Sequence, residues 1–436
     1  MKIALNGFVI FCLVSVVLAD GKAPDFSKPL SAEECVKIAL ERSPSVVKAR
    51  AAVTEASAGK QSAWSGLVPQ VTGQGSYSKS GPHATGYTQT SNGQLVPSSD
   101  HSYSGSLSAS QTLFDVGRFA QVGQANKGFE AAKAGEKGTQ QLLAYDVKQA
   151  YYSVVKARKT VEAVQSQLDQ SVEQEKLTRE LKRLGSASQV DLLKIQVQLS
   201  QSKTDLLTAQ NGEAVSRANL CAAMGIDVNT PIQVIEEVRY EEQAPKLEDL
   251  MGRARKQRPD LVQAQAVLSE YRTASWAAKG QYLPRLSASA GYSYRDPDFP
   301  ESWQYVKDRY TWSTGISASW TLFDGLLTHA NIRTADAREA SAEADLRAAE
   351  QSAEVEVKQA YLNYTLMLEK VKLAEEILGE AEESYRLTNE KYRLGAASTL
   401  DLLTSQTTLT QARVQEASSL GDLKIAEAAL AKAIGE

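Results

Sequence analysis

The sequence predicts an α+β membrane protein with an internal two-fold repeat, in which each half combines paired β-strands with long helices. Three observations lead to this prediction. The same series of motifs occurs twice along the 436 residues. Within each copy the hydrophobic period changes from helical to alternating and back. Beyond the N-terminus, no apolar run approaches the roughly 20 residues of a membrane-spanning helix, so any membrane contact is expected to come from strands.

The N-terminus has the pattern of a secretory signal peptide over residues 1–19. Lys2 precedes an apolar core from Phe8 to Leu18, and Ala19 supplies the small residue at which signal peptidase cuts. We therefore expect the mature chain to be exported. Cys12 lies inside the apolar core, so no lipid anchor is predicted there.

Two cysteines, Cys35 and Cys221, remain after this cleavage. Their wide separation in sequence favours two small buried side chains. An exported compartment also permits a disulfide between them. Neither interpretation implies chemistry.

Charge and motif content argue against several classes of function. The formal net charge is -4, so no nucleic-acid partner is predicted. His83 and His101 fall in a predicted loop, His329 stands alone at a helix start, and no zinc, nucleotide or nucleophile motif occurs. The sequence therefore predicts no enzyme, no cofactor and no metal site.

Two matching halves, repeat 1 at residues 30–225 and repeat 2 at residues 246–436, account for most of the chain. The stretch RLGSASQVDLL beginning at Arg183 recurs as RLGAASTLDLL at Arg393, and the tetrapeptide TLFD occurs once in each half. Residues 226–245 are acidic and contain two prolines, as a linker would. Each repeat is predicted to contain a helix, two strands, a long helix, a hairpin tip and a return helix.

Alternating hydrophobicity predicts two strands in each repeat, and it is sharpest near the end of the second pair. Tyr310 and Trp312 stand eight to ten residues from Trp320, which is about 26 to 33 Å along a strand. With a tilt of about 45°, these aromatics fall near both edges of an apolar band about 25 Å tall. We interpret all three as lipid-facing, with a soluble sandwich strand as the alternative. The strands are expected at about 70–80, 102–114, 285–296 and 308–323.

Long loops, at residues 81–101 and 296–308, are predicted to connect the strands of each pair, because both are rich in Gly, Pro, Ser, Asn and Asp. Four strands cannot close a membrane barrel, since about eight are needed. An open sheet would leave unpaired edges in lipid, which is prohibitive. Several chains are therefore expected to share one barrel.

Each repeat then contains a proline-free helical pattern, from about 116 to 184 and from about 325 to 394. At 1.5 Å per residue each helix would reach roughly 100 Å. Apolar positions recur at spacings of three and four in a narrow stripe, as in coiled coils. Gly185 and Gly395 are expected to end these helices, and Leu192 begins the stripe of a return helix. The pattern predicts two helical hairpins.

The TLFD tetrapeptides are expected to mark the passage from strand to helix. Asp115 and Asp324 directly precede the long helices, and aspartate is a favoured N-cap residue. A ligand contact is the alternative interpretation. The predicted strand-to-helix turns comprise Leu113, Phe114, Asp115, Leu322, Phe323 and Asp324.

Signal peptide, duplicated halves, paired strands, LFD turns and RLG tips together resemble the TolC family of outer-membrane efflux proteins over nearly all of the mature chain. The resemblance implies a homotrimer whose twelve strands close one barrel in outer-membrane lipid, continuous with a long helical barrel through the periplasm. It implies a periplasmic adaptor (membrane fusion protein) and an inner-membrane pump as partners. The implied function is the exit duct of a tripartite efflux or type I secretion system in a Gram-negative cell envelope.

A periplasmic coiled-coil tether without a pore is the alternative function. It would have no use for strands banded with aromatics, and a simple diffusion porin would need no long helices. The sequence leaves the cargo and the type of pump open, because the selecting residues lie largely in the inner-membrane partner.

The resemblance also places the pore constriction close to the hairpin tips. In the family an aspartate six residues after each tip glycine lies near the constriction, which corresponds here to Asp191 and Asp401. The alternative role is a carboxylate favoured by the dipole of a helix N-terminus. Relatives carry a second acidic residue one turn further on, where this chain has Thr404. A single carboxylate ring and weak block by divalent cations are therefore expected.

Contacts of the tips follow from the same resemblance. The family tyrosine before the second tip is kept as Tyr392, which implies an interprotomer lock by a hydrogen bond to Asp191 of a neighbour. The family arginine after that tip is replaced by Ala397. The adaptor is expected to contact the tips at Arg183, Leu184, Gly185, Ser186, Arg393, Leu394, Gly395 and Ala396.

Overall fold

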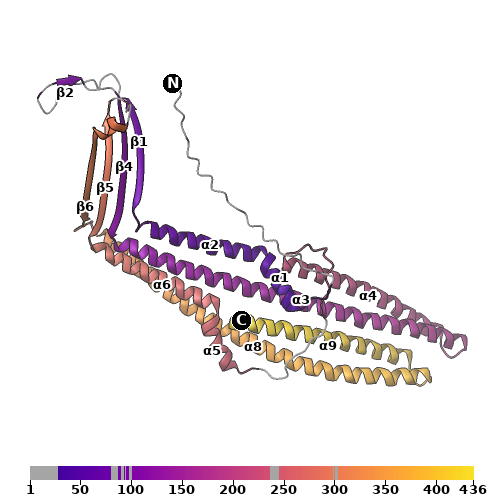
Figure 1. Cartoon of the computed structure of the whole chain (residues 1–436). Coiled ribbons are helices and arrows are strands. Elements are labelled where there is room, and N and C mark those ends of the chain that lie inside the picture. Colours follow the sequence, from indigo (N-terminus) through magenta and orange to yellow (C-terminus); the bar gives the residue numbers. More distant parts are fainter. Residues whose placement is uncertain are drawn as a thin grey trace, which may run out of the picture.

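A four-stranded sheet stands at one end of a long bundle of helices (Figure 1). This arrangement, contributed by two similar halves, confirms the predicted α+β class. The expected signal peptide and His83 lie outside the described residues. The computed structural model describes residues 28–79, 87–89, 93, 95–97, 101–235, 245–297, 299 and 303–436.

The sheet takes two strands from each repeat, in the order β1-β4-β5-β6. Every neighbouring pair is antiparallel, and the two repeats meet at the central β4–β5 pair. β1 and β6 are therefore the open edges of the sheet. The strands are β1 (Gln70–Lys79), β4 (His101–Phe114), β5 (Arg285–Asp296) and β6 (Tyr310–Ser319).

Both predicted loops contain short elements. β2 (Tyr87–Gln89) pairs with β3 (Leu95–Pro97) as a separate two-stranded ribbon. A short helix, α7 (Trp303–Lys307), lies between β5 and β6. Composition alone did not indicate this local structure.

β6 is shorter than the strand predicted at 308–323. Its last pair is to Arg285, and the preceding residue, Pro284, has no N–H with which to continue the ladder. Trp320 instead donates its indole N–H to the Tyr282 carbonyl oxygen, 2.9 Å away. The prediction that the strand continues to residue 323 is wrong.

Two short helices, rather than the single one predicted, precede the strands in each repeat. Pro44 and Pro259 each stand at the first turn of the second helix, where a missing N–H is tolerated, and each breaks the helix before it. A 3₁₀ turn, η2 (Gly280–Tyr282), leads on to β5. The helices are α1 (Ala32–Arg42), α2 (Pro44–Ser65), α5 (Leu247–Gln257) and α6 (Pro259–Lys279).

Two long helical hairpins form the rest of the chain. α3 (Val116–Arg183) has 68 residues and α8 (Leu327–Arg393) has 67, which gives each a length of about 100 Å. The return helices α4 (Gln189–Met224) and α9 (Thr399–Ile434) have 36 residues each and cover only the half next to the tips. Over the other half, α3 packs against α2 and α6, and α6 also packs against α8.

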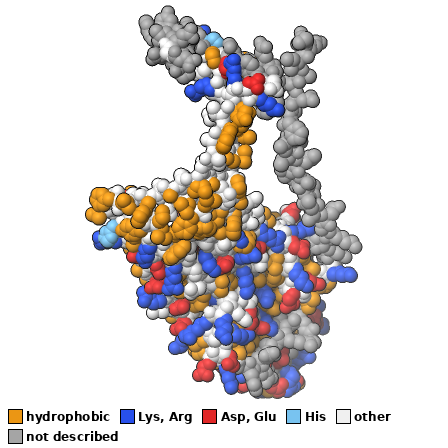
Figure 2. All heavy atoms as spheres, turned by 60° about the vertical axis from the view of Figure 1, so that its left-hand side comes forward, with side chains coloured by type: hydrophobic (Ala, Val, Ile, Leu, Met, Phe, Trp, Pro, Cys, Tyr) orange, Lys and Arg blue, Asp and Glu red, His pale blue; other side chains and the backbone are white. Residues whose placement is uncertain are grey.

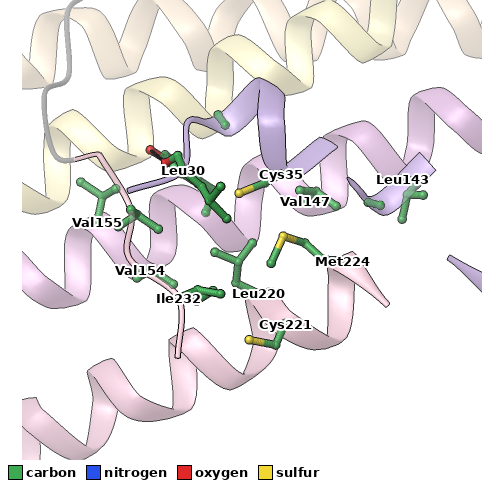
Figure 3. Packing of buried hydrophobic residues seen from close by; sticks show 14 of the residues in the cluster. Leu30, Cys35, Leu143, Val147, Val154, Val155, Leu220, Cys221, Met224 and Ile232 are labelled. Atoms are coloured by element: carbon green, nitrogen blue, oxygen red, sulfur yellow. Dashed lines mark hydrogen bonds between the residues drawn. The ribbon is translucent and has the colours of Figure 1, made fainter. Parts of the chain in front are cut away.

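The main hydrophobic clusters lie where the return helices meet the start of each repeat. In repeat 1, Cys35, Val147 and Leu220 are completely buried between α1, α3 and α4 (Figure 3). In repeat 2, Leu250 and Val357 occupy the corresponding cluster between α5, α8 and α9. The two halves thus share a core as well as motifs.

The first part of the predicted linker belongs to this core. Ile232 and Val234 are buried, and Leu30 donates its N–H to the Gln233 carbonyl oxygen at 2.8 Å. The hydroxyl of Tyr151 donates to the Leu30 carbonyl oxygen at 3.1 Å. Much of the remaining linker lies outside the described residues.

Cys35 and Cys221 are free thiols and both are buried. Burial raises the pKa of the Cys35 thiol to about 12 and also raises the pKa of Cys221. The interpretation of these residues as small buried side chains is confirmed.

Candidate functional site: the hairpin tips and the sheet

The two hairpin tips have the same backbone geometry. Gly185 and Gly395 adopt φ angles of 80° and 74°, a left-handed conformation that glycine enters without steric cost. Beyond each glycine an N–H returns to the last turn of the helix: Ser186 bonds the Leu181 carbonyl oxygen and Ala396 bonds that of Lys391, both at 2.8 Å. Each long helix therefore ends in a closed cap that turns the chain back.

Asp191 and Asp401 take part in the caps of the return helices. The Asp401 N–H donates to Ser398 Oγ at 3.1 Å, and the Ser398 N–H donates to Asp401 Oδ2 at 3.0 Å. Ser188 and Asp191 form the same reciprocal capping box. The structure thus gives both aspartates the capping role that was the alternative to a pore function.

These hydrogen bonds also lower the pKa of both carboxyl groups. The Ser398 hydroxyl and N–H hold the pKa of Asp401 below its usual value. The Ser188 hydroxyl lowers the pKa of Asp191 in the same way. The Ser188 N–H and the side chain of Thr399, at the other tip, lower it further. Both carboxylates are therefore ionised at neutral pH. Asp401 is exposed, as is Thr404 one turn further along α9.

Tyr392 is buried inside the chain, with 7% of its surface exposed. Its hydroxyl lies 3.1 Å from Thr178 Oγ1 on α3. Within one chain it therefore contacts the neighbouring hairpin and not Asp191. The interprotomer hydrogen bond stays a prediction for an assembly of several chains.

A buried polar seam joins the two hairpins, and the sequence analysis missed it. Gln406 on α9 donates from Nε2 to the Gln167 carbonyl oxygen at 3.2 Å and to Ser171 Oγ at 3.1 Å. Ser171 also bonds Ser202 on α4 at 3.1 Å. A search for apolar periodicity passes over a stripe whose members are Gln, Ser and Thr. The α3 side of this polar seam consists of Gln167, Ser171, Gln174 and Thr178.

The polar seam is incompletely paired among the described residues. The side-chain oxygens of Gln174 and Gln406 are buried without a hydrogen-bond partner there. A buried polar atom without a partner raises the free energy of the packed state. The contact between the hairpins is therefore weaker here than a fully apolar contact would be.

The two faces of the sheet differ in chemistry. One face carries hydroxyl pairs between neighbouring strands, such as Thr72 with Ser108 at 2.7 Å and Ser287 with Ser317 at 2.8 Å. The opposite face carries large apolar side chains, including two of the three predicted lipid-facing aromatics, Tyr310 and Trp312. The third, Trp320, lies just beyond the end of β6. Tyr310, Trp312 and Trp320 are 41%, 68% and 61% exposed in the single chain. A sheet of this kind suits lipid on one side and water on the other.

The strand-to-helix turns of the two repeats are built differently. Asp115 is the N-cap of α3 as predicted, accepting from the Gly117 N–H at 2.8 Å. Asp324 is not the N-cap of α8, so that prediction is wrong. The N-cap is Leu326, and Asp324 accepts from the Thr328 N–H at 2.8 Å. The reason is that two left-handed residues, Gly325 and Leu326, stand between Asp324 and α8, so the N-cap position falls to Leu326 although the Asp324 carboxylate still accepts from the first turn of the helix.

Large hydrophobic side chains gather where the sheet meets the helices (Figure 2). Leu113 and Phe114 end β4, whereas Leu322 and Phe323 follow β6 and are 79% and 80% exposed. No helix in the described part of the chain is both long enough and apolar enough to cross a membrane. The described residues also contain no group of three or more side chains that could hold a metal ion.

Known proteins share this sequence pattern and this fold. The sequence model of the family described as Outer membrane efflux protein matches residues 35–226 and 250–436. Outer membrane protein TolC of Vibrio cholerae serotype O1 is 22% identical over 335 residues, which cover 76% of each chain. Among solved structures, the Campylobacter jejuni CmeC outer membrane channel has a TM-score of 0.79 at 17% identity, covering 93% of this chain and 85% of that one. The open state of the Neisseria gonorrhoeae MtrE outer membrane channel has a TM-score of 0.78 at 19% identity, covering 93% and 88%.

At these identities the solved structures establish the fold, whereas the match of the family model over most of both repeats establishes the family. The predicted resemblance is thereby confirmed. The chain belongs to the family of outer membrane efflux proteins and forms the outer-membrane exit duct of an efflux system, reaching into the periplasm.

Proposed function

We propose that three copies of this chain close one barrel and one helical tunnel, docked to a periplasmic adaptor and an inner-membrane pump. The observation that carries the proposal is the four-stranded sheet with two open edges at the end of helices about 100 Å long. One copy cannot satisfy the backbone groups of its edge strands in lipid. Three copies would supply twelve strands, enough to close a barrel.

Light scattering of the detergent-solubilised protein tests this stoichiometry. A trimer is expected, and the same particles should conduct ions in planar bilayers. A monodisperse monomer would rule out a shared barrel. A trimer without conductance would favour the periplasmic tether, which should also wash off membranes without detergent.

The tips are the proposed docking surface for the adaptor, because they lie farthest from the sheet (Figure 1). Leu184 and Leu394 are 67% and 84% exposed there, although leucine normally prefers to be buried. Crosslinking at the tips, followed by identification of the captured proteins, tests for an adaptor and reveals the type of pump. The transported cargo passes through and is not altered, so we propose no catalytic role.

Asp401 and Asp191 are the proposed charged groups of the pore constriction, with Thr404 beside Asp401. The exposed Asp401 carboxylate suits a ring of three around a narrow opening, where it would favour cations. For the lock, the Tyr392 hydroxyl would both donate and accept, bonding Thr178 of its own chain and Asp191 of a neighbour.

Two variants separate these contacts of Tyr392. Tyr392→Phe removes both hydrogen bonds, whereas Thr178→Val removes only the bond within the chain. If the lock exists, Tyr392→Phe should raise the conductance of the closed channel more than Thr178→Val does. If both variants change the conductance equally, Tyr392 makes only the contact within its own chain.

A further inference from the structure

One long side of α8 lacks the neighbours that its counterpart in repeat 1 has. Near the sheet α3 lies between α2 and α6, and near the tips it lies between α4 and α9. α8 is the counterpart of α3, and its long neighbours are α6 near the sheet and α9 near the tips. In the described part of the chain, no long helix lies beside α8 where α6 and α9 lie beside α3. The helices that correspond to those two, α2 and α4, would have to come from a second copy.

The internal repeat defines which residues correspond. Between α3 and α8, and between α4 and α9, the offset is 210 residues, as from Arg183 to Arg393. Between α2 and α6 it is 215, as from Pro44 to Pro259. The two tips end at similar distances from the sheet (Figure 1), so the step from repeat 1 to repeat 2 brings little shift along the helices. The same step can therefore be repeated around a closed ring.

The uncovered face of α8 runs from Ala330 to Ile377 and is apolar in the half near the tips. Leu362, Leu366, Leu373 and Ile377 are between 50% and 56% exposed. Their spacings of four and seven residues place them on one side of the helix. Leucine and isoleucine are normally buried, and a long apolar stripe at a surface indicates that another chain covers it.

The counterpart of this stripe on α3 packs against α9. Lys156 corresponds to Leu366, and its Nζ lies 2.8 Å from Asp422 Oδ1 on α9. A Cβ atom added at Gly421 would lie 3.3 Å from Lys156 Cβ, so the two helices approach closely there. The residue of α4 that corresponds to Gly421 is Asn211. The same contact would therefore bring Asn211 of a second copy against Leu366.

Nearer the sheet, small side chains line the uncovered face. Ala330 and Ser341 are exposed on α8, whereas their counterparts on α3, Ala120 and Ala131, are buried. The face forms a shallow groove of about 560 Å³. Because small side chains let a second helix approach closely, the groove suits a helix in the place that α6 takes beside α3.

Charges on the two faces would match in this register. On α3, a Cβ atom added at Gly135 would lie 3.8 Å from the side chain of Gln263 on α6. The corresponding residues are Asp345 on α8 and Lys48 on α2, and both are exposed. Opposite charges would therefore face each other between α8 and α2 of a second copy.

A second pair follows near the tips. Arg413 Nη1 on α9 donates to Ser166 Oγ on α3 at 2.8 Å. The corresponding residues, Lys203 on α4 and Glu376 on α8, are again exposed and opposite in charge. In the described part of the chain, none of the four side chains in these two pairs has a hydrogen-bond or ion-pair partner.

We propose that the uncovered face of α8 packs against α2 and α4 of the next copy, in the register that α3 has with α6 and α9. This register forms two ion pairs between copies: Asp345 with Lys48, and Glu376 with Lys203. The proposal rests on the trimer proposed above and adds which helix faces meet and how they are aligned.

Disulfide trapping tests the register in the full-length protein. With Cys35 and Cys221 replaced by alanine, Leu366→Cys is combined with Asn211→Cys. The two Cβ atoms should lie within disulfide distance, so non-reducing gels should show a covalent trimer. In the control, Leu366→Cys with Lys203→Cys, the second thiol lies about 12 Å further along the same face of α4 and should not crosslink.

The outcomes of this trapping are distinct. A trimer crosslinked in the control but not in the test pair would overturn the register. If neither pair crosslinks although the wild-type protein is a trimer, α8 does not pack against α4 of the next copy. A monomeric wild-type protein would instead defeat the proposed function.

A charge exchange tests the pair nearer the sheet. Asp345→Lys and Lys48→Asp should each lower the temperature at which the trimer dissociates, because like charges then face each other. The double variant restores opposite charges and should recover most of the loss. Arg347→Asp is the control, since its counterpart on α3, Lys137, is exposed and so faces away from the contact; it should have little effect. Additive losses in the double variant would overturn the ion pair.

Discussion

Leu326 is the only non-glycine residue with a positive φ angle in the described part of the chain, at 73°. It follows Gly325, which has a φ angle of 69°, so two successive left-handed residues turn the chain from the sheet into α8. A side chain with a Cβ atom is disfavoured in this conformation. The turn at the start of α8 therefore stores backbone strain at one residue.

Leu326→Gly should relieve that strain and stabilise the folded protein by about 1 kcal/mol. The measurement is thermal denaturation of the purified protein. Leu327→Gly is the matched control, because Leu327 is the first residue of α8 and glycine there should not stabilise. Equal shifts from both substitutions would show that backbone strain at Leu326 is not the cause.

Asp401 gives a prediction on pH dependence. Its pKa is lowered in the folded chain, so its stabilising contribution is present above the unfolded pKa of about 4 and is lost as the pH falls through the folded value. If Asp401 lines the pore, the cation preference in planar bilayers should disappear over the same acidic range. Ser398→Ala removes the first cause of the lowered pKa, so it should move this change to higher pH.

Asp401→Asn should abolish the cation preference at neutral pH, whereas Thr404→Asp should strengthen block by divalent cations through a second carboxylate ring. If neither substitution alters selectivity or block, Asp401 acts only as a helix-capping carboxylate.

At the scale of elements, the polar seam between the hairpins differs from the apolar clusters between the other packed helices. Gln406 is completely buried, yet one side-chain atom has no partner among the described residues. Leu409, one turn further along α9, lies in an apolar cluster with Ala381 and Ala412. The contact between α3 and α9 at Gln406 is thus polar, whereas the contact between α8 and α9 one turn further on is apolar.

Gln406→Leu should strengthen the contact of α9 with α3 by about 1 kcal/mol, because it removes a buried unpaired oxygen. It also removes the two hydrogen bonds donated by Nε2, but their acceptors keep partners, since the Ser171 hydroxyl donates to the Gln167 carbonyl oxygen at 2.9 Å. Ser171 keeps its bond to Ser202 in this variant. We expect harder opening, seen as less frequent open events in planar bilayers and slower export. Thr407→Leu is the control, because Thr407 is the exposed neighbour of Gln406. It should change neither the frequency of open events nor the rate of export. Easier opening of the Gln406 variant would contradict the role given to the polar seam.

The tips give a second prediction at this scale. Gly395→Asp adds a charge to an open surface, since a Cβ atom there would meet nothing within 4 Å. It should impair export while trimers still reach the outer membrane. Gly395→Asn is the matched control, because asparagine also tolerates the left-handed backbone but carries no charge. Normal export by the aspartate variant would argue against docking at this tip.

At the scale of the whole molecule, the two hairpins are nearly equal in length. α3 and α8 have 68 and 67 residues, and both return helices have 36. The two tips therefore end at similar distances from the sheet (Figure 1). A tunnel built from alternating hairpins needs this equality in order to present one continuous end.

Removing one heptad from each of α3, α4, α8 and α9 should preserve the helix contacts, because the helical face repeats over that interval. Trimers should form, but export should fall because the tips no longer reach the adaptor. Shortening only α3 and α4 should also destabilise the closed end, measured as continuous ion leakage. If the variant shortened in all four helices leaks ions and the variant shortened only in α3 and α4 does not, equal hairpin length is not required.

Local patterns in the sequence were sufficient to predict the repeat, the four strands, the hairpin tips and the N-cap at Asp115. These features depend on side chains close in sequence: alternation along a strand, a left-handed glycine, or an aspartate beside a free N–H. The capping role of Asp191 and Asp401 was also visible, as the alternative to a pore function. The family followed from the combined order of these patterns.

Only the tertiary structure decided the features that depend on residues far apart in the chain. In the structure β6 ends where its pairing with β5 ends, and Leu326, not Asp324, is the N-cap of α8. Tyr392 bonds Thr178, and the first part of the linker packs against Leu30. The polar seam also became visible only there. Each of these features is set by which partner occupies the opposite side of a contact, and a single sequence does not encode that partner in any local pattern.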